Sequence, residues 1–155
     1  MERHERYFDH EREGWFLHLH GSPLFVTRDG EPRKITRASL SEYAGENSFH
    51  IVLTNADSKP SVIENSSILR VYWKKLDELL GDAARITVFG YGGGDRHLNR
   101  LIGLNNTAEL RIVSRTGGDP EPEVSAKWRR KLGAVENQAV KVVLVENLMH
   151  FTEWR

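Results

Sequence analysis

The sequence predicts an α/β fold, a partial Rossmann-like three-layer domain with a mainly parallel sheet. Two observations support this prediction. Short apolar runs, several rich in β-branched residues, alternate with amphipathic helical patterns along most of the chain. The order strand, helix, strand, helix, strand is that of parallel strands joined by crossover helices. We therefore expect a single domain portion over 1–155, with a polar extension at 1–14 and the α/β body at 15–155.

The first part of the body is expected to hold two strands with a helix between them. Trp15 to Leu19 is a short apolar run that Gly21 and Pro23 would end, which favours a buried strand. His50 to Thr54 is the second expected strand, because it is rich in β-branched residues. Between them, Thr36 to Tyr43 has the pattern of a capped helix.

The later part of the chain has the clearer pattern. Ser67 to Leu80 is the strongest helix, because apolar residues recur at three- and four-residue spacing, Ser66 or Ser67 can cap its start, and Gly81 follows its end. We expect this helix to pack on a sheet and Trp73 to lie in the core. Further strands are expected at 85–89, 109–114 and 139–145, and further helices at 95–102 and 125–132.

Composition limits the possible functions. With 155 residues, 39% of them hydrophobic, the chain can form one real core. Its 22 basic and 22 acidic side chains cancel, so no global field attracts nucleic acid or an anionic membrane. The absence of cysteine removes disulfides, thiolate catalysis and cysteine zinc sites. We see neither a signal peptide nor a membrane-spanning run, and expect a soluble cytoplasmic protein.

A glycine-rich stretch, Gly90 to Gly94, follows the strand expected at 85–89. In parallel sheets, such a turn exposes backbone N–H groups and leads into a helix whose N-terminus favours anions. Asp95 would either cap that helix, the interpretation we favour, or bind a ribose hydroxyl. The spacing matches neither the G-x-G-x-x-G nor the P-loop pattern, so a tight turn without a ligand remains the alternative.

Two histidines at alternate positions, His18 and His20, would lie on the same side of the first expected strand. A metal site needs a third ligand, and the other histidines show no diagnostic spacing, so we do not favour a metal. The remaining interpretations are a packed histidine or a general base. His20 would stand at the carboxyl end of its strand, where it is well placed to abstract a proton.

These two stretches together resemble the sirtuin-like NAD-binding domains, and most closely their divergent branch in bacterial stand-alone and defence-associated proteins. The resemblance is carried by Leu19-His20-Gly21-Ser22 and by Phe89-Gly90-Tyr91-Gly92 with Gly94-Asp95. It implies cleavage of the nicotinamide–ribose bond of NAD, with His20 as the catalytic histidine. It also implies contacts to NAD or ADP-ribose from Gly21, Ser22, Gly90, Tyr91, Gly92, Asp95, Ser114 and Arg115.

The departures from that family are equally informative. The family's first βα unit, with its glycine-alanine-glycine phosphate loop, and its Gln-Asn-x-Asp stretch would precede Trp15, where only fourteen residues stand. We therefore expect the carboxyl-terminal portion of such a domain, as a short variant, one half of a split protein or a fragment. An active enzyme would need the missing half from a partner chain or a second copy. Without cysteines the family's zinc module is absent, which disfavours a protein deacylase. The alternative is a non-catalytic nucleotide-binding or protein-interaction module.

Two further stretches have simpler interpretations. The basic run Lys127 to Lys131 is expected to be a solvated helix face rather than a nucleic-acid contact. The aromatic residues of Met149 to Trp154 either cover the sheet or mark a docking surface.

Overall fold

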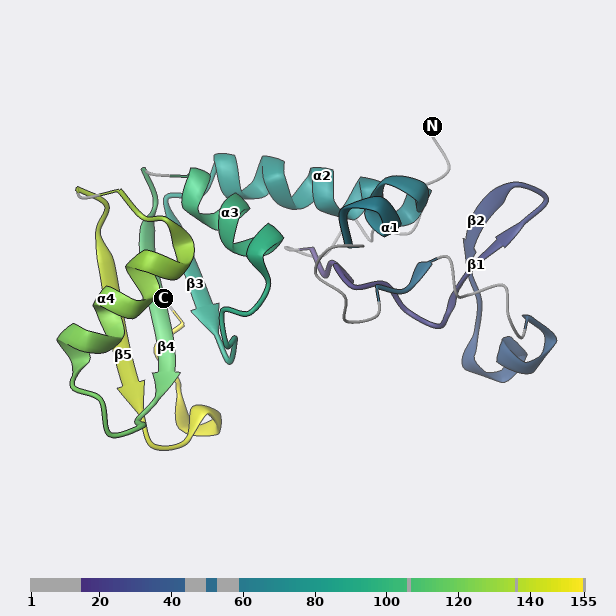
Figure 1. Cartoon of the computed structure of the whole chain (residues 1–155). Coiled ribbons are helices and arrows are strands. Elements are labelled where there is room, and N and C mark those ends of the chain that lie inside the picture. Colours follow the sequence, from purple (N-terminus) through teal and green to yellow (C-terminus); the bar gives the residue numbers. More distant parts are fainter. Residues whose placement is uncertain (1–14, 44–49, 53–58, 106, 136, 155) are drawn as a thin grey trace. The chain divides into compact units, whose positions relative to one another are not determined.

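The computed structural model in Figure 1 describes residues 15–43, 50–52, 59–105, 107–135 and 137–154. The polar extension predicted at 1–14 lies outside these residues. The chain divides into two compact units, Met1–Lys74 and Lys75–Arg155. Among the described helices, none is both long and apolar enough to cross a bilayer.

The first unit contains an antiparallel hairpin of β1 (Phe25–Arg28) and β2 (Glu31–Lys34). Its turn is Asp29-Gly30, and both residues have positive φ, 54° and 77°. Two consecutive residues in this conformation make the tight hairpin turn that Asp-Gly favours. This hairpin was not predicted from the sequence, although Asp29-Gly30 is a strong local signal for it.

Helical segments follow in the described part of the first unit. A 3-10 helix at η2 (Arg37–Tyr43) stands where a capped helix was predicted, and α1 (Lys59–Asn65) was not predicted. The long helix α2 (Ser67–Gly81) begins here, and Ser66 Oγ accepts a hydrogen bond from the Leu69 amide, as a capping serine should. The fully or nearly buried apolar residues of the unit are Phe25, Val26, Ile63, Leu69 and Trp73, so the core position predicted for Trp73 is confirmed.

The first expected strand, Trp15 to Leu19, is wrong. Residues 15–18 are irregular, the Leu19 amide bonds to the Leu17 carbonyl, and the Gly21 amide bonds to the His18 carbonyl, so the chain turns on itself instead of pairing. Of the second expected strand, only residues 50–52 are described. Ile51 forms an isolated antiparallel bridge with Gly21 rather than a parallel ladder. Apolar runs this short do not by themselves distinguish a strand from a packed turn.

The second unit confirms the predicted α/β fold with a parallel sheet. Its strands are β3 (Arg85–Phe89), β4 (Glu109–Arg115) and β5 (Val140–Val145), which pair in parallel in the order β3-β4-β5. The crossover helices are α3 (Arg96–Leu104) and α4 (Glu121–Leu132). All these elements were predicted to within a few residues, because their apolar periodicities are long and unambiguous.

One face of this sheet packs against the helices. The buried cluster on that face is Leu80, Ile86, Val88, Ile102, Ala108, Leu110, Ile112, Trp128, Leu132 and Val142. The other face is covered by the carboxyl-terminal segment that follows η4 (Leu148–His150). There the Phe151 ring is buried and lies 5.9 Å from the Phe89 ring, so the aromatic residues near the terminus cover the sheet.

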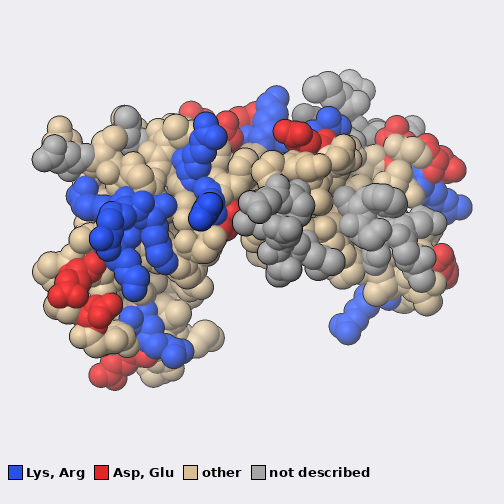
Figure 2. All heavy atoms as spheres, in the orientation of Figure 1, with Lys and Arg blue, Asp and Glu red and all other residues tan. Residues whose placement is uncertain are grey.

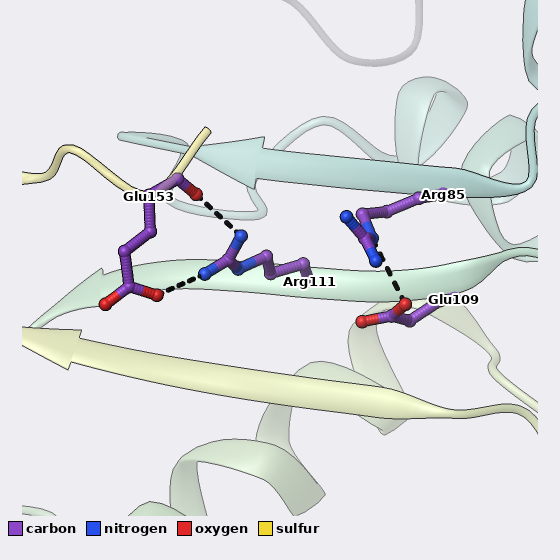
Figure 3. Close-up of polar contacts among 4 residues, drawn as sticks. All are labelled: Arg85, Glu109, Arg111 and Glu153. Carbon is purple, nitrogen blue, oxygen red and sulfur yellow. Dashed lines mark hydrogen bonds and ion pairs between the residues drawn. The ribbon is translucent and has the colours of Figure 1, made fainter. Parts of the chain in front are cut away.

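Polar contacts hold this segment to the sheet (Figure 3). The buried guanidinium of Arg111 donates 2.6 Å hydrogen bonds to the carbonyl oxygen and to the carboxylate of Glu153, and it lies over the Phe151 ring. Arg85 and Glu109 form an ion pair of 3.1 Å where β3 and β4 begin. The carboxyl-terminal segment is thus held on the sheet both by the Phe151 ring and by the charge-assisted contact of Arg111 with Glu153.

Candidate functional site

The glycine-rich loop lies at the carboxyl edge of the parallel sheet, between β3 and α3. Phe89, the last residue of β3, pairs with Val113 of β4, so Gly90 follows at the level where Ser114 and Arg115 end the neighbouring strand. The structure therefore brings Gly90 to Gly94 to the same sheet edge as Ser114 and Arg115. Ligands of open parallel sheets bind at this edge.

The glycines of this loop serve different purposes. Gly90 and Gly93 have positive φ, and a Cβ at Gly93 would stand 2.7 Å from Lys131 Cδ and 3.0 Å from the Trp128 ring. At Gly92 and Gly94, by contrast, a Cβ would meet nothing within 4 Å. Gly93 is required for the packing of the loop, whereas Gly92 and Gly94 leave open space beside the backbone.

Asp95 is the N-cap of α3. Its Oδ1 accepts hydrogen bonds from the backbone N–H groups of His97 at 3.0 Å and of Leu98 at 3.1 Å. The capping interpretation is confirmed, and the first turn of α3 has a carboxylate partner for two of its amides.

A side-chain network inside the chain fixes the loop. The Tyr91 hydroxyl accepts from the Asp95 amide at 2.8 Å and donates to Asn99 Oδ1 at 2.9 Å, while Asn99 Nδ2 donates to the Gly93 carbonyl at 3.0 Å. Burial, with a smaller effect of the Asp95 charge, raises the pKa of Tyr91 above its ordinary value. Asn99 was missed by the sequence analysis. Its position four residues after Asp95, on the same helix face, is the signal that could have found it.

His20 lies in the first unit, in a turn, and its side chain meets Lys59. Its Nε2 is 3.0 Å from Lys59 Nζ, which identifies this ring nitrogen as an acceptor of an ammonium proton. Lys59 is only 6% exposed, and its ammonium lies 4.6 Å from the centre of the Trp73 ring. The nitrogen that would take a proton in catalysis is therefore engaged by Lys59, a residue that the sequence analysis did not single out.

The two residues after His20 have structural roles in the first unit. Gly21 has φ of 82°, and a Cβ there would overlap the His50 carbonyl oxygen. Ser22 Oγ accepts a hydrogen bond of 3.2 Å from the Leu24 amide. His-Gly-Ser in this chain thus forms a tight turn against His50.

His50, in the first unit, is a buried histidine. Its Nδ1 lies 2.8 Å from Ser66 Oγ and its Nε2 lies 2.8 Å from Thr27 Oγ1, so both ring nitrogens have hydroxyl partners. Burial lowers the pKa of His50, because a charged imidazolium is costly away from water. Within the described residues, no three ligand-bearing side chains lie close enough together to hold a metal ion.

The basic run of α4 does not form one uniform face. Trp128 is buried in the core, and Arg129 turns inward to donate to the Val135 and Gln138 carbonyls. Lys131 Nζ donates to the Gly92 carbonyl at 2.5 Å and lies 5.3 Å from the centre of the Trp128 ring. Lys131 therefore contacts the glycine-rich loop directly.

No protein-family model, curated protein or solved structure matches this chain. The sirtuin-like resemblance therefore stays a prediction from two short motifs. These motifs lie in different units, His20 in the first and Gly90 to Asp95 in the second.

Proposed function

We propose that the second unit binds a phosphate-bearing nucleotide, of the NAD or ADP-ribose type, at the carboxyl edge of its parallel sheet. The observation that supports this proposal is the open backbone at Gly92 and Gly94, between the end of β3 and the capped start of α3. Without side chains there, a phosphate can approach the backbone N–H groups closely.

Charge at the same edge favours the same ligand. Arg115 ends β4 with an exposed side chain, and none of the ion pairs between described residues includes it. An exposed guanidinium beside a glycine-rich turn suits a diphosphate, since it can form two parallel hydrogen bonds with phosphate oxygens. Ser114, one residue earlier, offers a hydroxyl that can bind a ribose hydroxyl.

The experiment measures the melting temperature of the full chain with NAD, with ADP-ribose and without ligand. A ligand present at about 100 times its Kd should stabilise the folded state by roughly 2.7 kcal/mol, which is easily detected as a higher melting temperature. Gly92→Phe fills the open space and should weaken nucleotide affinity by at least about tenfold, a loss of ~1.4 kcal/mol.

Gly81→Phe is the matched control. Gly81 is the last residue of α2, near the opposite end of β3, and a Cβ there also meets nothing within 4 Å. It should leave the ligand-induced shift intact. If neither nucleotide raises the melting temperature, or if both variants lose the shift equally, the proposal fails.

Cleavage of NAD is a separate question that the same samples answer. Hydrolysis would require His20 to act as a base, and its Nε2 already accepts from Lys59. We therefore expect binding without nicotinamide release. Nicotinamide release that His20→Ala abolishes would instead assign the NAD-hydrolysing activity to this chain.

A further inference from the structure

A basic groove lies between α3 and α4. Its volume is about 370 Å³, and four cationic side chains line it, Arg96 and Arg100 from α3 and Arg130 and Lys131 from α4. None of the residues that line it is acidic. Figure 2 shows Lys and Arg side chains gathered over these two helices. We call this feature the α3–α4 groove.

Close packing of the helix ends forms the floor of the groove. A Cβ at Gly103 of α3 would overlap the Leu132 carbonyl oxygen of α4, so the missing side chain lets the two helices approach. Gly133 then ends α4 in the left-handed conformation, with φ of 62°, and turns the chain away. The close approach of the two helix backbones therefore determines the position of the groove, and the long cationic side chains surround it.

Within the described residues, three of the four cations of the groove have no acidic partner. None of the ion pairs between described residues includes Arg96, Arg100 or Arg130. The chain as a whole has equal numbers of basic and acidic side chains, so this is a local concentration of positive charge. Cations held together without counter-charges repel one another, and a bound polyanion would relieve that repulsion.

We propose that the α3–α4 groove binds the sugar-phosphate backbone of a single-stranded nucleic acid. Arginine guanidinium groups match phosphate oxygens in geometry and charge, and here they come from both walls. The four cationic side chains of the groove are exposed, so a phosphate backbone can reach them from solvent. Leu104, 64% exposed and part of the lining, supplies an apolar contact for a sugar or base. A positively charged groove that follows the phosphate backbone is typical of proteins that bind single strands.

The groove and the proposed nucleotide site share Lys131, which lines the groove and donates to the Gly92 carbonyl. The test of the groove proposal therefore uses Arg100 and Arg130, whereas the nucleotide proposal depends on the open backbone at Gly92. The two proposals can therefore fail separately. A Gly92→Phe chain that loses NAD-dependent stabilisation should still bind an oligonucleotide.

The test is fluorescence anisotropy of the full chain with labelled single-stranded DNA and RNA oligonucleotides of about 12 nucleotides. Arg100→Glu/Arg130→Glu should lower the affinity for at least one of them by at least about tenfold at 0.1 M salt. The control Arg37→Glu/Arg70→Glu changes the net charge by the same amount on exposed residues of the first unit, and should bind within about twofold of the unmodified chain. Circular dichroism checks that both variants remain folded.

The salt dependence tests the number of contacts. For four phosphates the slope of log K against log salt should be about −2.8, and the groove variant should lose about half of it. Equal loss of affinity in both double variants would overturn the proposal, because net charge alone would then account for binding. Binding to phosphatidylserine vesicles or to an acidic peptide, with none to either oligonucleotide, would also overturn it.

Discussion

Lys131 Nζ donates a 2.5 Å hydrogen bond to the carbonyl oxygen of Gly92, and so ties the last turn of α4 to the loop after β3. The Trp128 side chain, three residues earlier on α4, packs against the same loop at Gly93. The glycine-rich loop is therefore part of the α4 packing as well as the start of α3. Because only some of its glycines pack against α4, substitutions at different glycines should change stability by different amounts.

Gly93→Ala should destabilise the second unit by about 1–2 kcal/mol, because the left-handed backbone disfavours a side chain and the new Cβ would press on Lys131 and Trp128. Gly92→Ala is the matched control, since its Cβ would meet nothing within 4 Å. Urea unfolding of both variants measures the difference. Equal stability of the two variants would contradict the packing role of Gly93.

Asp95→Ala should cost about 1 kcal/mol of stability, because the His97 and Leu98 amides lose their acceptor. Asp95→Ser should keep most of that stability, since a serine hydroxyl can also cap a helix. Amide hydrogen exchange at these two residues gives a local measurement. Unchanged exchange in Asp95→Ala would mean that other groups satisfy the amides.

Phe151→Ala should cost about 3 kcal/mol, because the ring is only 6% exposed and covers the face of the sheet that carries Arg111. Met149→Ala, two residues earlier, should change stability by less than about 0.5 kcal/mol, since Met149 is 85% exposed. Thermal unfolding of the two variants compares them directly. Similar effects would argue against the carboxyl-terminal segment as a cover for the sheet.

Acidification should destabilise the first unit. Burial lowers the pKa of His50 below its ordinary value of 6.5, so the folded state favours the neutral ring. Burial, and then the nearby Lys34 charge, lower the pKa of His18 in the same direction. This stability is complete above pH 6.5 and is lost as the pH falls from 6.5 toward the folded-state values.

The measurement is the free energy of unfolding between about pH 7.5 and about pH 5, with His50→Gln for comparison. The variant should show a shallower decline below pH 6.5, because it lacks one of these two histidines. Parallel pH profiles would show that protonation of His50 does not contribute.

The sequence predicted the second unit well and the first unit poorly, for a physical reason. The strands around Val88 and Ile112 bury apolar residues in the core, and the helices of this unit have amphipathic periods. In the first unit, Trp15 to Leu19 is irregular and then turns, and its first two aromatic residues are exposed. The hairpin strand Glu31–Lys34 is mostly exposed and carries almost no apolar signal.

The candidate site was predicted in position but not in its contacts. The place of Gly90 to Asp95 followed from the order of elements, and the Asp95 cap followed from its position before a helix. The hydrogen bond from Lys131 to Gly92 joins residues 39 positions apart, and the pair of His20 with Lys59 likewise joins residues 39 apart, so no local pattern could reveal either. Contacts of this kind depend on tertiary packing.

The hydrogen bonds among Tyr91, Asp95 and Asn99 have a thermodynamic consequence for any ligand of the loop. They hold the loop backbone in one conformation without a ligand, so binding does not have to immobilise it. Ordering a flexible backbone costs roughly 1–2 kcal/mol of conformational free energy per residue. In this loop that ordering occurs on folding, so it does not reduce the free energy of ligand binding. Tyr91→Phe would return part of that entropy to the free state, and calorimetry should then show a larger unfavourable entropy of binding with little change in enthalpy.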